Sequence, residues 1–207
     1  MKNLGEMLQQ QGPFSEIVLG NTALARAMIE SGTEVITSYP GSPTPEIASA
    51  LLSIPAGKRP FYFEFSTNEK VATEVACGAS LNGHPSCVFF KSVGLNVAAD
   101  SFVQLSLMEL TGGLVAVLGD DPGANSSQNE QDNRHVARMA YIPVLEPSSP
   151  SEAYRYYLEA MALSRRMKMP VILRMTTHVC HGKEKVAFGA WEKKAPGTEP
   201  RFDSSAG

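Results

Sequence analysis

Apolar runs of strand length alternate with helix-length patterns about six times between residues 16 and 182, and this alternation constrains the fold most. The longer apolar runs are EVITSY (34–39), FYFEF (61–65), CVFFK (87–91), LVAVLG (114–119), IPVLE (142–146) and VILRM (171–175). Helical patterns occupy 22–32, 45–54, 69–83, 96–110 and 151–167. Continuous apolar runs are typical of parallel strands buried between helices. We therefore predict an α/β, doubly wound domain with a mostly parallel sheet of about six strands and helices on both faces.

The two ends of the chain lack this alternation, which suggests three parts. A chain of 207 residues and 22.3 kDa is long enough for one sizeable domain with its own core. Residues 1–15 are predicted to be an N-terminal leader, and residues 16–185 the domain. Residues 186–207 gather Pro, Gly, Ser and Lys, which predicts a linker or disordered tail.

Charge and hydropathy exclude several classes of protein. The net charge of −3 gives no electrostatic reason to expect a nucleic-acid partner. No apolar run approaches the roughly 20 residues of a membrane span, and MKNLGEMLQQQGPF lacks the apolar core of a signal peptide. We therefore expect a cytoplasmic protein without a membrane span. The three cysteines form no CxxC pair, so neither a disulfide framework nor an iron–sulfur ligand set is indicated.

Polar segments follow five of the predicted strands. Because the carboxyl ends of parallel strands meet at one edge of a sheet, where ligands bind in open α/β folds, these segments predict a functional rim. The connections expected at the opposite edge, such as 82–85, are short turns. The five segments are 39–44, 66–69, 91–96, 119–134 and 146–149.

Four of the rim segments have other interpretations as well. Ser66 to Glu69 fits a capping box, in which Ser66 caps a helix and Glu69 bonds back to its amide; the residues alone favour this over catalysis. Segment 39–44 could be a rigid turn into a helix, and 91–96 a site for an anion or a closely approaching ligand. Segment 119–134 could be a functional lid or a disordered loop. Asp120 and Asp121 lack the partners of a metal site, so no metal is predicted.

Four motifs, taken in order, resemble a known family: YPGSPTPEI, NEKVATEVACGASLNG, KSVGLNVAAD, and DDPGANSSQNEQDNR with ARMAYIPVLEPSSPSEA after it. They resemble the pyrimidine-binding domain of thiamine-diphosphate-dependent 2-oxoacid:ferredoxin oxidoreductases, most closely the N-terminal domain of the indolepyruvate-type alpha subunit. The resemblance covers roughly residues 16 to 182. It implies a thiamine-diphosphate-binding fold of the pyrimidine type.

The resemblance also implies roles for individual residues. In this family a glutamate hydrogen-bonds N1′ of the cofactor's aminopyrimidine and so promotes loss of the thiazolium C2 proton; the motif gives Glu69 this catalytic role. Capping and catalysis need not exclude each other. The further residues implied for cofactor binding are Tyr39, Pro40, Gly41, Ser42, Lys91, Gly94 and Asn96. Those implied for a substrate or subunit-interface loop are Ser42, Asn125, Ser126, Ser127, Gln128, Asn129 and Arg134.

Other parts of the family's machinery have no counterpart in the sequence. No GDG…N motif is present to hold Mg²⁺ and the diphosphate, and no cluster cysteines are present. The resemblance therefore implies that Mg²⁺ and the iron–sulfur clusters are bound by partner domains. It implies that a pyrophosphate domain comes from a partner subunit or a chain extension, in a homodimer or hetero-oligomer, and that this chain is inactive alone.

The complete enzyme would decarboxylate an aryl- or alkyl-2-oxoacid such as indolepyruvate or pyruvate oxidatively, form an acyl-CoA from coenzyme A and reduce ferredoxin. Two alternatives stay open at this point. One is a component of a non-oxidative thiamine-dependent 2-oxoacid decarboxylase. The other is a non-catalytic binding module with flavodoxin-like topology.

Overall fold

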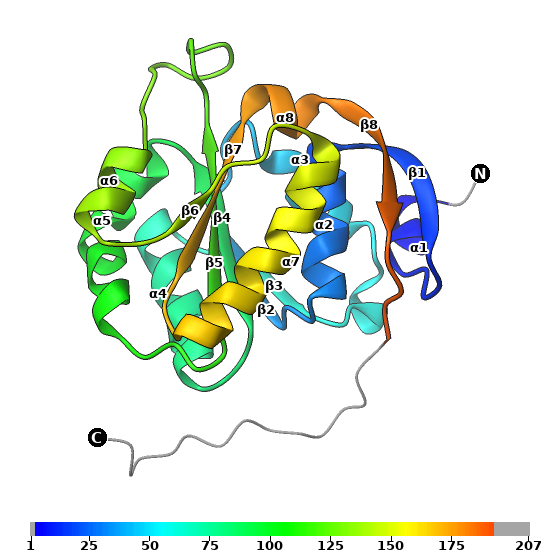
Figure 1. Ribbon diagram of the computed structural model, residues 1–207, viewed down its shortest axis with the longest axis horizontal. Helices are drawn as coiled ribbons and strands as arrows, with labels where there is room; N and C mark the ends of the chain where they lie inside the picture. Colours follow the sequence, from blue (N-terminus) through cyan, green and yellow to red (C-terminus); the bar gives the residue numbers. More distant parts are fainter. Residues whose placement is uncertain (1–2, 193–207) are drawn as a thin grey trace.

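A parallel sheet of six strands forms the centre of the computed structural model, which describes residues 3–192 (Figure 1). The strand order is β3-β2-β4-β5-β7-β6, and every pair of neighbours is parallel. The predicted fold class is confirmed. The strands are β2 (Val35–Ser38), β3 (Tyr62–Phe65), β4 (Ser86–Lys91), β5 (Leu114–Asp120), β6 (Val144–Leu145) and β7 (Val171–Thr176).

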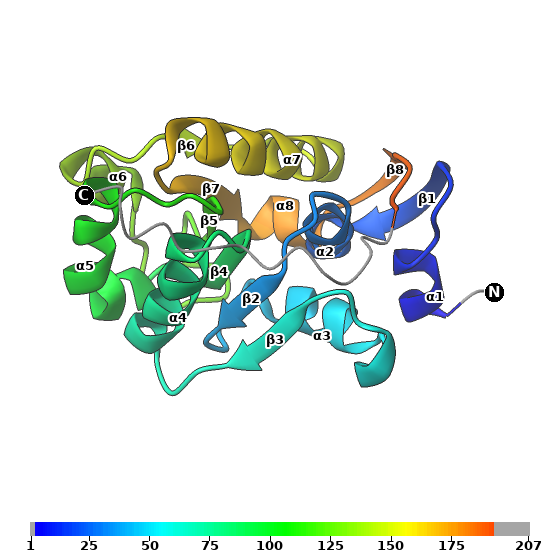
Figure 2. The ribbon, with the colours of Figure 1, turned by 90° about the horizontal axis from the view of Figure 1, so that it is seen from below.

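Helices cover both faces of this sheet, as Figure 2 shows. One face carries α2 (Gly20–Glu30), α3 (Pro45–Leu52) and α7 (Pro150–Met167). The other carries α4 (Glu69–Leu81), α5 (Gly94–Gln104) and α6 (Arg134–Met139). Short 3-10 helices lie at η1 (Ala56–Lys58) and η2 (Leu105–Leu107). None of the helices within residues 3–192 is long and apolar enough to cross a lipid bilayer.

The central strands are apolar over most of their length because both of their faces are buried. In β4, Cys87 and Phe89 pack into the core under α2, α3 and α7, whereas Val88 and Phe90 pack into the core under α4 and α5. Successive side chains of a strand point to opposite faces, so each strand contributes side chains alternately to the two cores. This is why the sequence shows continuous apolar runs rather than an apolar–polar alternation.

The two ends of the described chain pair with each other beside the main sheet. Strand β1 (Phe14–Leu19) lies antiparallel to β8 (Lys183–Phe188), next to the short helices α1 (Leu4–Leu8) and α8 (Thr177–His181). Thus α1 lies inside the predicted leader, and β8 crosses the boundary predicted between residues 185 and 186. Residues 193–207 of the predicted tail lie outside the described residues, and the division into three parts stays a prediction.

The buried side chain of Arg26 holds these two ends against α2. Its Nη1 donates to the carbonyl oxygens of Leu8, at 2.8 Å, and Gln10, at 2.7 Å. Its Nη2 donates to the carbonyl oxygen of Gly189 at 3.0 Å. No local feature of the sequence predicts this arrangement, because the paired segments are more than 160 positions apart.

The start of α2 differs from the prediction. The predicted helical pattern begins at residue 22, but α2 begins at Gly20 and Asn21 is buried in its first turn. The Asn21 Nδ2 instead donates to the Pro43 carbonyl oxygen and to Glu46 Oε2, both at 2.8 Å. The side chain therefore ties α2 to the start of α3.

Candidate functional site

The segments after β2, β4 and β5 meet at one edge of the sheet. The loop joining β5 to α6 (residues 121–133), called the β5–α6 loop below, rises above this edge in Figure 1. The Ser42 and Ser126 hydroxyls are hydrogen-bonded at 3.0 Å, and Lys91 Nζ donates to Gln128 Oε1 at 3.0 Å. Three of the five predicted rim segments are thus in direct contact.

Glu69 begins α4, but it does not form the predicted capping box. Asn68 is the cap: its backbone is extended and its side chain accepts from the Val71 amide at 2.9 Å. Ser66 Oγ instead donates to Glu64 Oε1 at 2.7 Å. A capping box needs its glutamate three positions after the cap, and Glu69 follows Asn68 directly. The interpretation of Glu69 as a capping residue was wrong.

The Glu69 carboxylate is buried and has no partner among the described residues. The residue is 6% exposed, and within residues 3–192 no hydrogen bond or ion pair reaches its side-chain oxygens. A carboxylate on a largely buried residue, without a protein partner, is suited to a ligand that can bond to it. The hydroxyl of Ser92, after β4, is also buried without a partner in this part of the chain.

Gly94, the first residue of α5, leaves the space that the Glu69 side chain occupies. A Cβ atom at position 94 would lie 2.6 Å from Glu69 Cγ, 2.7 Å from Glu69 Oε1 and 2.9 Å from Phe90 Cδ2. These distances are too short for any side chain. The absence of a side chain at 94 thus lets the start of α5 approach the carboxylate closely.

We expect Gly94→Ala to lower the free energy of unfolding by about 1–3 kcal/mol, because the new methyl group overpacks the space beside Glu69. Gly78→Ala is the matched control. Gly78 lies inside α4 with nothing within 4 Å of its would-be Cβ, so alanine should stabilise the helix by roughly 0.5–1 kcal/mol. Urea unfolding of both variants measures the difference. Equal stabilities would contradict the close approach of Gly94 to Glu69.

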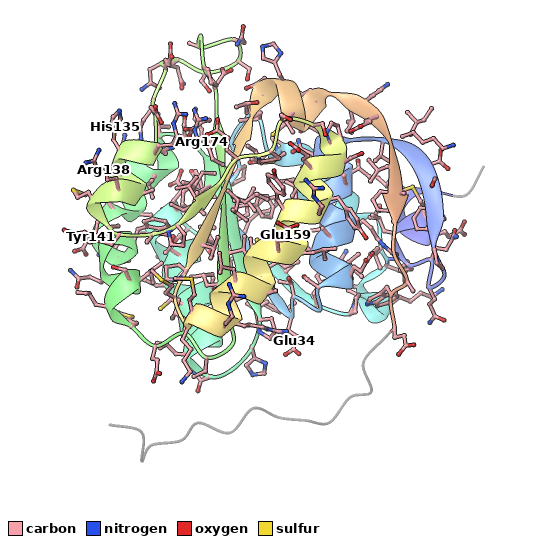
Figure 3. All side chains as sticks on the ribbon, in the orientation of Figure 1. Glu34, His135, Arg138, Tyr141, Glu159 and Arg174 are labelled. Carbon is pink, nitrogen blue, oxygen red and sulfur yellow. The ribbon has the colours of Figure 1, made fainter. Side chains whose placement is uncertain are left out.

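A buried ion pair anchors the β5–α6 loop. Asp120, the last residue of β5, is fully buried and accepts from Arg174 Nε at 2.7 Å and from the Asn133 amide at 3.1 Å. Burial raises the pKa of the Asp120 carboxyl, although Arg174 and Asn133 act against this shift. Arg174 also bonds to Glu146, in the fifth rim segment. Figure 3 shows Arg174 at the end of the sheet that carries the loop.

Asp121 holds the first half of the same loop. Its carboxylate accepts from the Ser126 amide at 2.6 Å and from Thr177 Oγ1 at 2.7 Å. Although burial opposes the shift, these hydrogen bonds lower the pKa of the Asp121 carboxyl to about 2. Both aspartates are therefore bound to protein groups and serve to position the loop.

A chain of amides connects the other end of the loop to α5. Gln131 Nε2 donates to Asn96 Oδ1 at 2.9 Å and to Asn133 Oδ1 at 2.7 Å. Asn96 was named from the sequence. Gln131 and Asn133 lie in the predicted rim segment 119–134 but were not named singly, and Arg174 was missed. One signal was available for Arg174: an arginine inside the apolar run VILRM must find a buried partner, and Asp120 ends a neighbouring strand.

Other predicted residues bond to groups outside the predicted set or make no side-chain hydrogen bond. Asn125 bonds within the loop, to the Pro122 carbonyl at 2.8 Å. Arg134 is paired with Asp132 at 2.7 Å and Glu146 at 3.4 Å, so its charge is already balanced. Among the described residues, the side chains of Tyr39, Ser127 and Asn129 make no hydrogen bond, and that of Pro40 has no polar group. The Ser127 hydroxyl is buried.

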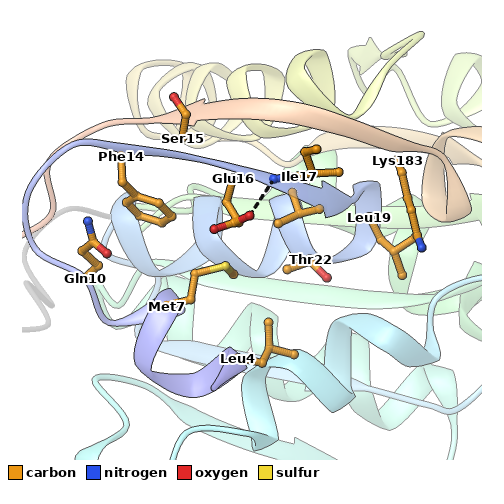
Figure 4. A pocket seen from close by; sticks show the side chains of 11 residues that line it. Leu4, Met7, Gln10, Phe14, Ser15, Glu16, Ile17, Leu19, Thr22 and Lys183 are labelled. Atoms are coloured by element: carbon orange, nitrogen blue, oxygen red, sulfur yellow. Dashed lines mark hydrogen bonds between the residues drawn. The ribbon is translucent and has the colours of Figure 1, made fainter. Parts of the chain in front are cut away.

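A groove of about 690 Å³ lies elsewhere, beneath β1 (Figure 4). It is lined by α1, β1 and neighbouring residues, among them Leu4, Met7, Phe14 and Lys183. None of the predicted site residues lines it. The groove lies beside the paired chain ends, away from the edge of the sheet where Ser42, Lys91 and the β5–α6 loop meet.

Comparison with known proteins identifies the class to which this fold and rim belong. Residues 26–204 match the family model described as pyruvate flavodoxin/ferredoxin oxidoreductase, thiamine diP-binding. The chain belongs to this thiamine-diphosphate-binding family. The resemblance inferred from the motifs is thereby confirmed.

Several subunits of known oxidoreductases are similar to this chain in sequence. The chain is 50% identical over 172 residues to the indolepyruvate oxidoreductase subunit IorA of Methanothermobacter marburgensis, covering 83% of this chain and 28% of the relative. It is 46% identical to IorA of Archaeoglobus fulgidus, over 86% of this chain and 29% of that subunit. It is 25% identical to the 2-oxoglutarate synthase subunit KorA of the same organism, over 84% of this chain and 51% of that subunit. The chain thus spans less than a third of the length of the IorA relatives.

A solved structure supports the fold independently. The chain superposes with a TM-score of 0.73 on a 2-oxoglutarate:ferredoxin oxidoreductase from Magnetococcus marinus, solved with 2-oxoglutarate, coenzyme A and succinyl-CoA bound. The two are 17% identical, and the match covers 86% of this chain and 32% of the other. At this identity the likeness concerns the fold.

The residues at the rim fit the aminopyrimidine part of thiamine diphosphate. A ring nitrogen that shares a proton would satisfy the unpartnered Glu69 carboxylate, and the amino group offers hydrogens to acceptors such as the Ser92 hydroxyl.

Proposed function

We propose that this chain supplies the aminopyrimidine side of the thiamine diphosphate site of a 2-oxoacid:ferredoxin oxidoreductase. One observation carries the proposal: Glu69 is a buried carboxylate without a partner among the described residues, on a fold of the thiamine-diphosphate-binding family. Such a group is satisfied when it shares a proton with a ring nitrogen.

Each part of the rim then has a task. When bound, thiamine diphosphate supplies the acidic thiazolium carbon that adds to the 2-oxo carbon and the electron sink for decarboxylation. Glu69 holds a proton at N1′ of the aminopyrimidine, and Gly94 leaves room for that contact. Asp120 and Asp121 fix the β5–α6 loop over the rim through Arg174, Asn133 and Ser126. This anchoring keeps the polar loop residues in place at the edge of the site.

The complete enzyme is proposed to oxidise a 2-oxoacid to an acyl-CoA and to pass the electrons to ferredoxin. The sequence identity to IorA subunits favours an aryl-2-oxoacid such as indolepyruvate. The diphosphate, Mg²⁺ and iron–sulfur clusters would be bound by a further domain or a partner subunit. We place the enzyme in the cytoplasm, where the three buried free cysteines would stay reduced.

A coupled assay tests this function in the assembled enzyme. With indole-3-pyruvate, coenzyme A and thiamine diphosphate, the enzyme is expected to reduce methyl viologen in place of ferredoxin, and omission of coenzyme A or cofactor should abolish sustained reduction. Release of carbon dioxide without viologen reduction would instead support a non-oxidative decarboxylase. No thiamine diphosphate binding at all would leave a non-catalytic module.

A further inference from the structure

Lys91 carries a positive charge that no carboxylate balances within residues 3–192. Its Nζ donates to a neutral acceptor, Gln128 Oε1, at 3.0 Å, and it takes part in no ion pair there. Two other cations differ in this respect: Arg174 is paired with Asp120 at the same rim, and Lys70 with Asp100 on the outer helices. An ammonium group left with a neutral partner beside a buried site is suited to an anionic ligand.

The stem of Lys91 is held in place by the segment after β2. A Cβ atom at Gly41 would lie 2.6 Å from both Cγ and Cδ of Lys91, so only glycine allows this packing. Lys91 ends β4 and is half-buried, which directs its ammonium to the rim. Because its aliphatic stem is already ordered, the side chain loses less conformational entropy when it binds a ligand.

Lys91 lies at the junction of β4 and α5, and so does Gly94, the residue that contacts Glu69. It precedes Gly94 by three positions, and Gly94 packs directly against the Glu69 carboxylate. The proposed function places the aminopyrimidine at Glu69, whereas the diphosphate lies at the other end of the cofactor, on the side that this chain does not supply. An anion bound at Lys91 is therefore better assigned to the substrate than to the cofactor.

We infer that Lys91 is the anchor for the carboxylate of the 2-oxoacid substrate. This inference rests on the proposed function and assigns a substrate-binding role within it. The substrate carboxylate replaces the Gln128 amide oxygen as acceptor of the Lys91 hydrogen bond. Charge-assisted hydrogen bonds are about twice as strong as neutral ones, so the exchange is favourable. Ser42 follows Gly41, which contacts the Lys91 stem, and its hydroxyl is bonded to Ser126 in the same loop as Gln128.

The test compares three variants of the assembled enzyme with indole-3-pyruvate as the probe. Lys91→Met is expected to raise the KM for the acid about 10- to 100-fold, the value of a lost charge-assisted hydrogen bond. The kcat and the dissociation constant of thiamine diphosphate, measured by quenching of intrinsic fluorescence, should change little. Lys91→Arg should recover part of the lost affinity. Lys168→Met, which removes an exposed lysine paired with Glu109, is the control and should leave KM unchanged.

The outcomes separate this inference from the proposed function. An unchanged KM in an active, cofactor-binding Lys91→Met enzyme would overturn the inference and leave the proposed function standing. A weakened cofactor with an unchanged KM would assign Lys91 to the cofactor and would also overturn it. If the wild-type enzyme bound no thiamine diphosphate or oxidised no 2-oxoacid, the proposed function would fail and this inference with it.

Discussion

Replacement of Glu69 with glutamine is expected to slow the exchange of the C2 proton of bound thiamine diphosphate by about 10²–10⁴-fold, the usual contribution of a general acid–base group. Glutamine keeps the size and one acceptor oxygen of the side chain, but it cannot share a proton with the ring nitrogen. Because the helix cap is Asn68, the fold should be almost unaffected. Proton exchange followed by NMR in the assembled enzyme, together with thermal unfolding, measures both quantities.

Asn68→Ala provides the matched control at the neighbouring position. It removes the hydrogen bond to the Val71 amide and should cost about 1 kcal/mol of stability, while C2 exchange stays close to the wild-type rate. The two variants should therefore show opposite patterns. If Glu69→Gln kept its exchange rate within about threefold of wild type, well short of the expected loss, Glu69 would have no part in catalysis.

Replacement of Arg174 with methionine is expected to lower the free energy of unfolding by about 3–5 kcal/mol. Arg174 is 4% exposed and Asp120 is fully buried, so the variant leaves a buried carboxylate without its cation. The hydrogen bonds from Asn133 compensate only in part. Urea unfolding of the wild type and the variant measures the loss.

The loss should also depend on pH, with a definite sign. Burial already raises the pKa of Asp120, and removal of the guanidinium should raise it further. Between the ordinary aspartate pKa and this raised value, the folded variant holds a proton that the unfolded chain has released. Stability then falls as pH rises, so the deficit should be smaller at about pH 4.5 than at about pH 7.

Two further variants serve as controls for Arg174. Asp120→Asn combined with Arg174→Met removes both charges and should recover part of the stability, because no buried charge remains unpaired. Arg155→Met breaks exposed pairs with Glu152 and Glu159 and should cost about 1 kcal/mol or less. An Arg174→Met loss as small as that of Arg155→Met would show that the buried pair does not stabilise the rim.

The strands, the sheet type and the position of the rim could be predicted from the sequence because their signals are local. A strand buried on both faces is apolar over most of its length, as β4 and β5 are. Polar residues directly after such strands must then meet at one edge, as Ser42 and Ser126 do. The family resemblance could be recognised from the motifs around Glu69 for the same reason, because the residues of each motif are contiguous in the chain.

The cap of α4 shows where local signals were insufficient. Ser66, Thr67 and Asn68 are all good capping residues, and the spacing of Ser66 to Glu69 favoured the wrong one. Pairing of β3 with β2 decided the outcome, since it keeps the chain extended to Phe65 and engages the Ser66 amide with the Ser38 carbonyl at 2.9 Å. The helix therefore starts after Asn68.

The sequence by itself determined a parallel α/β domain, its rim and a glutamate at the start of α4. Tertiary structure alone decided the rest: that Glu69 is buried without a partner, that Arg174 pairs with Asp120, and that β1 pairs with β8. Each of these depends on groups that lie far apart in the chain. Apolar periodicity records how a segment meets the core, but a single sequence does not record which distant polar groups meet once the core has formed.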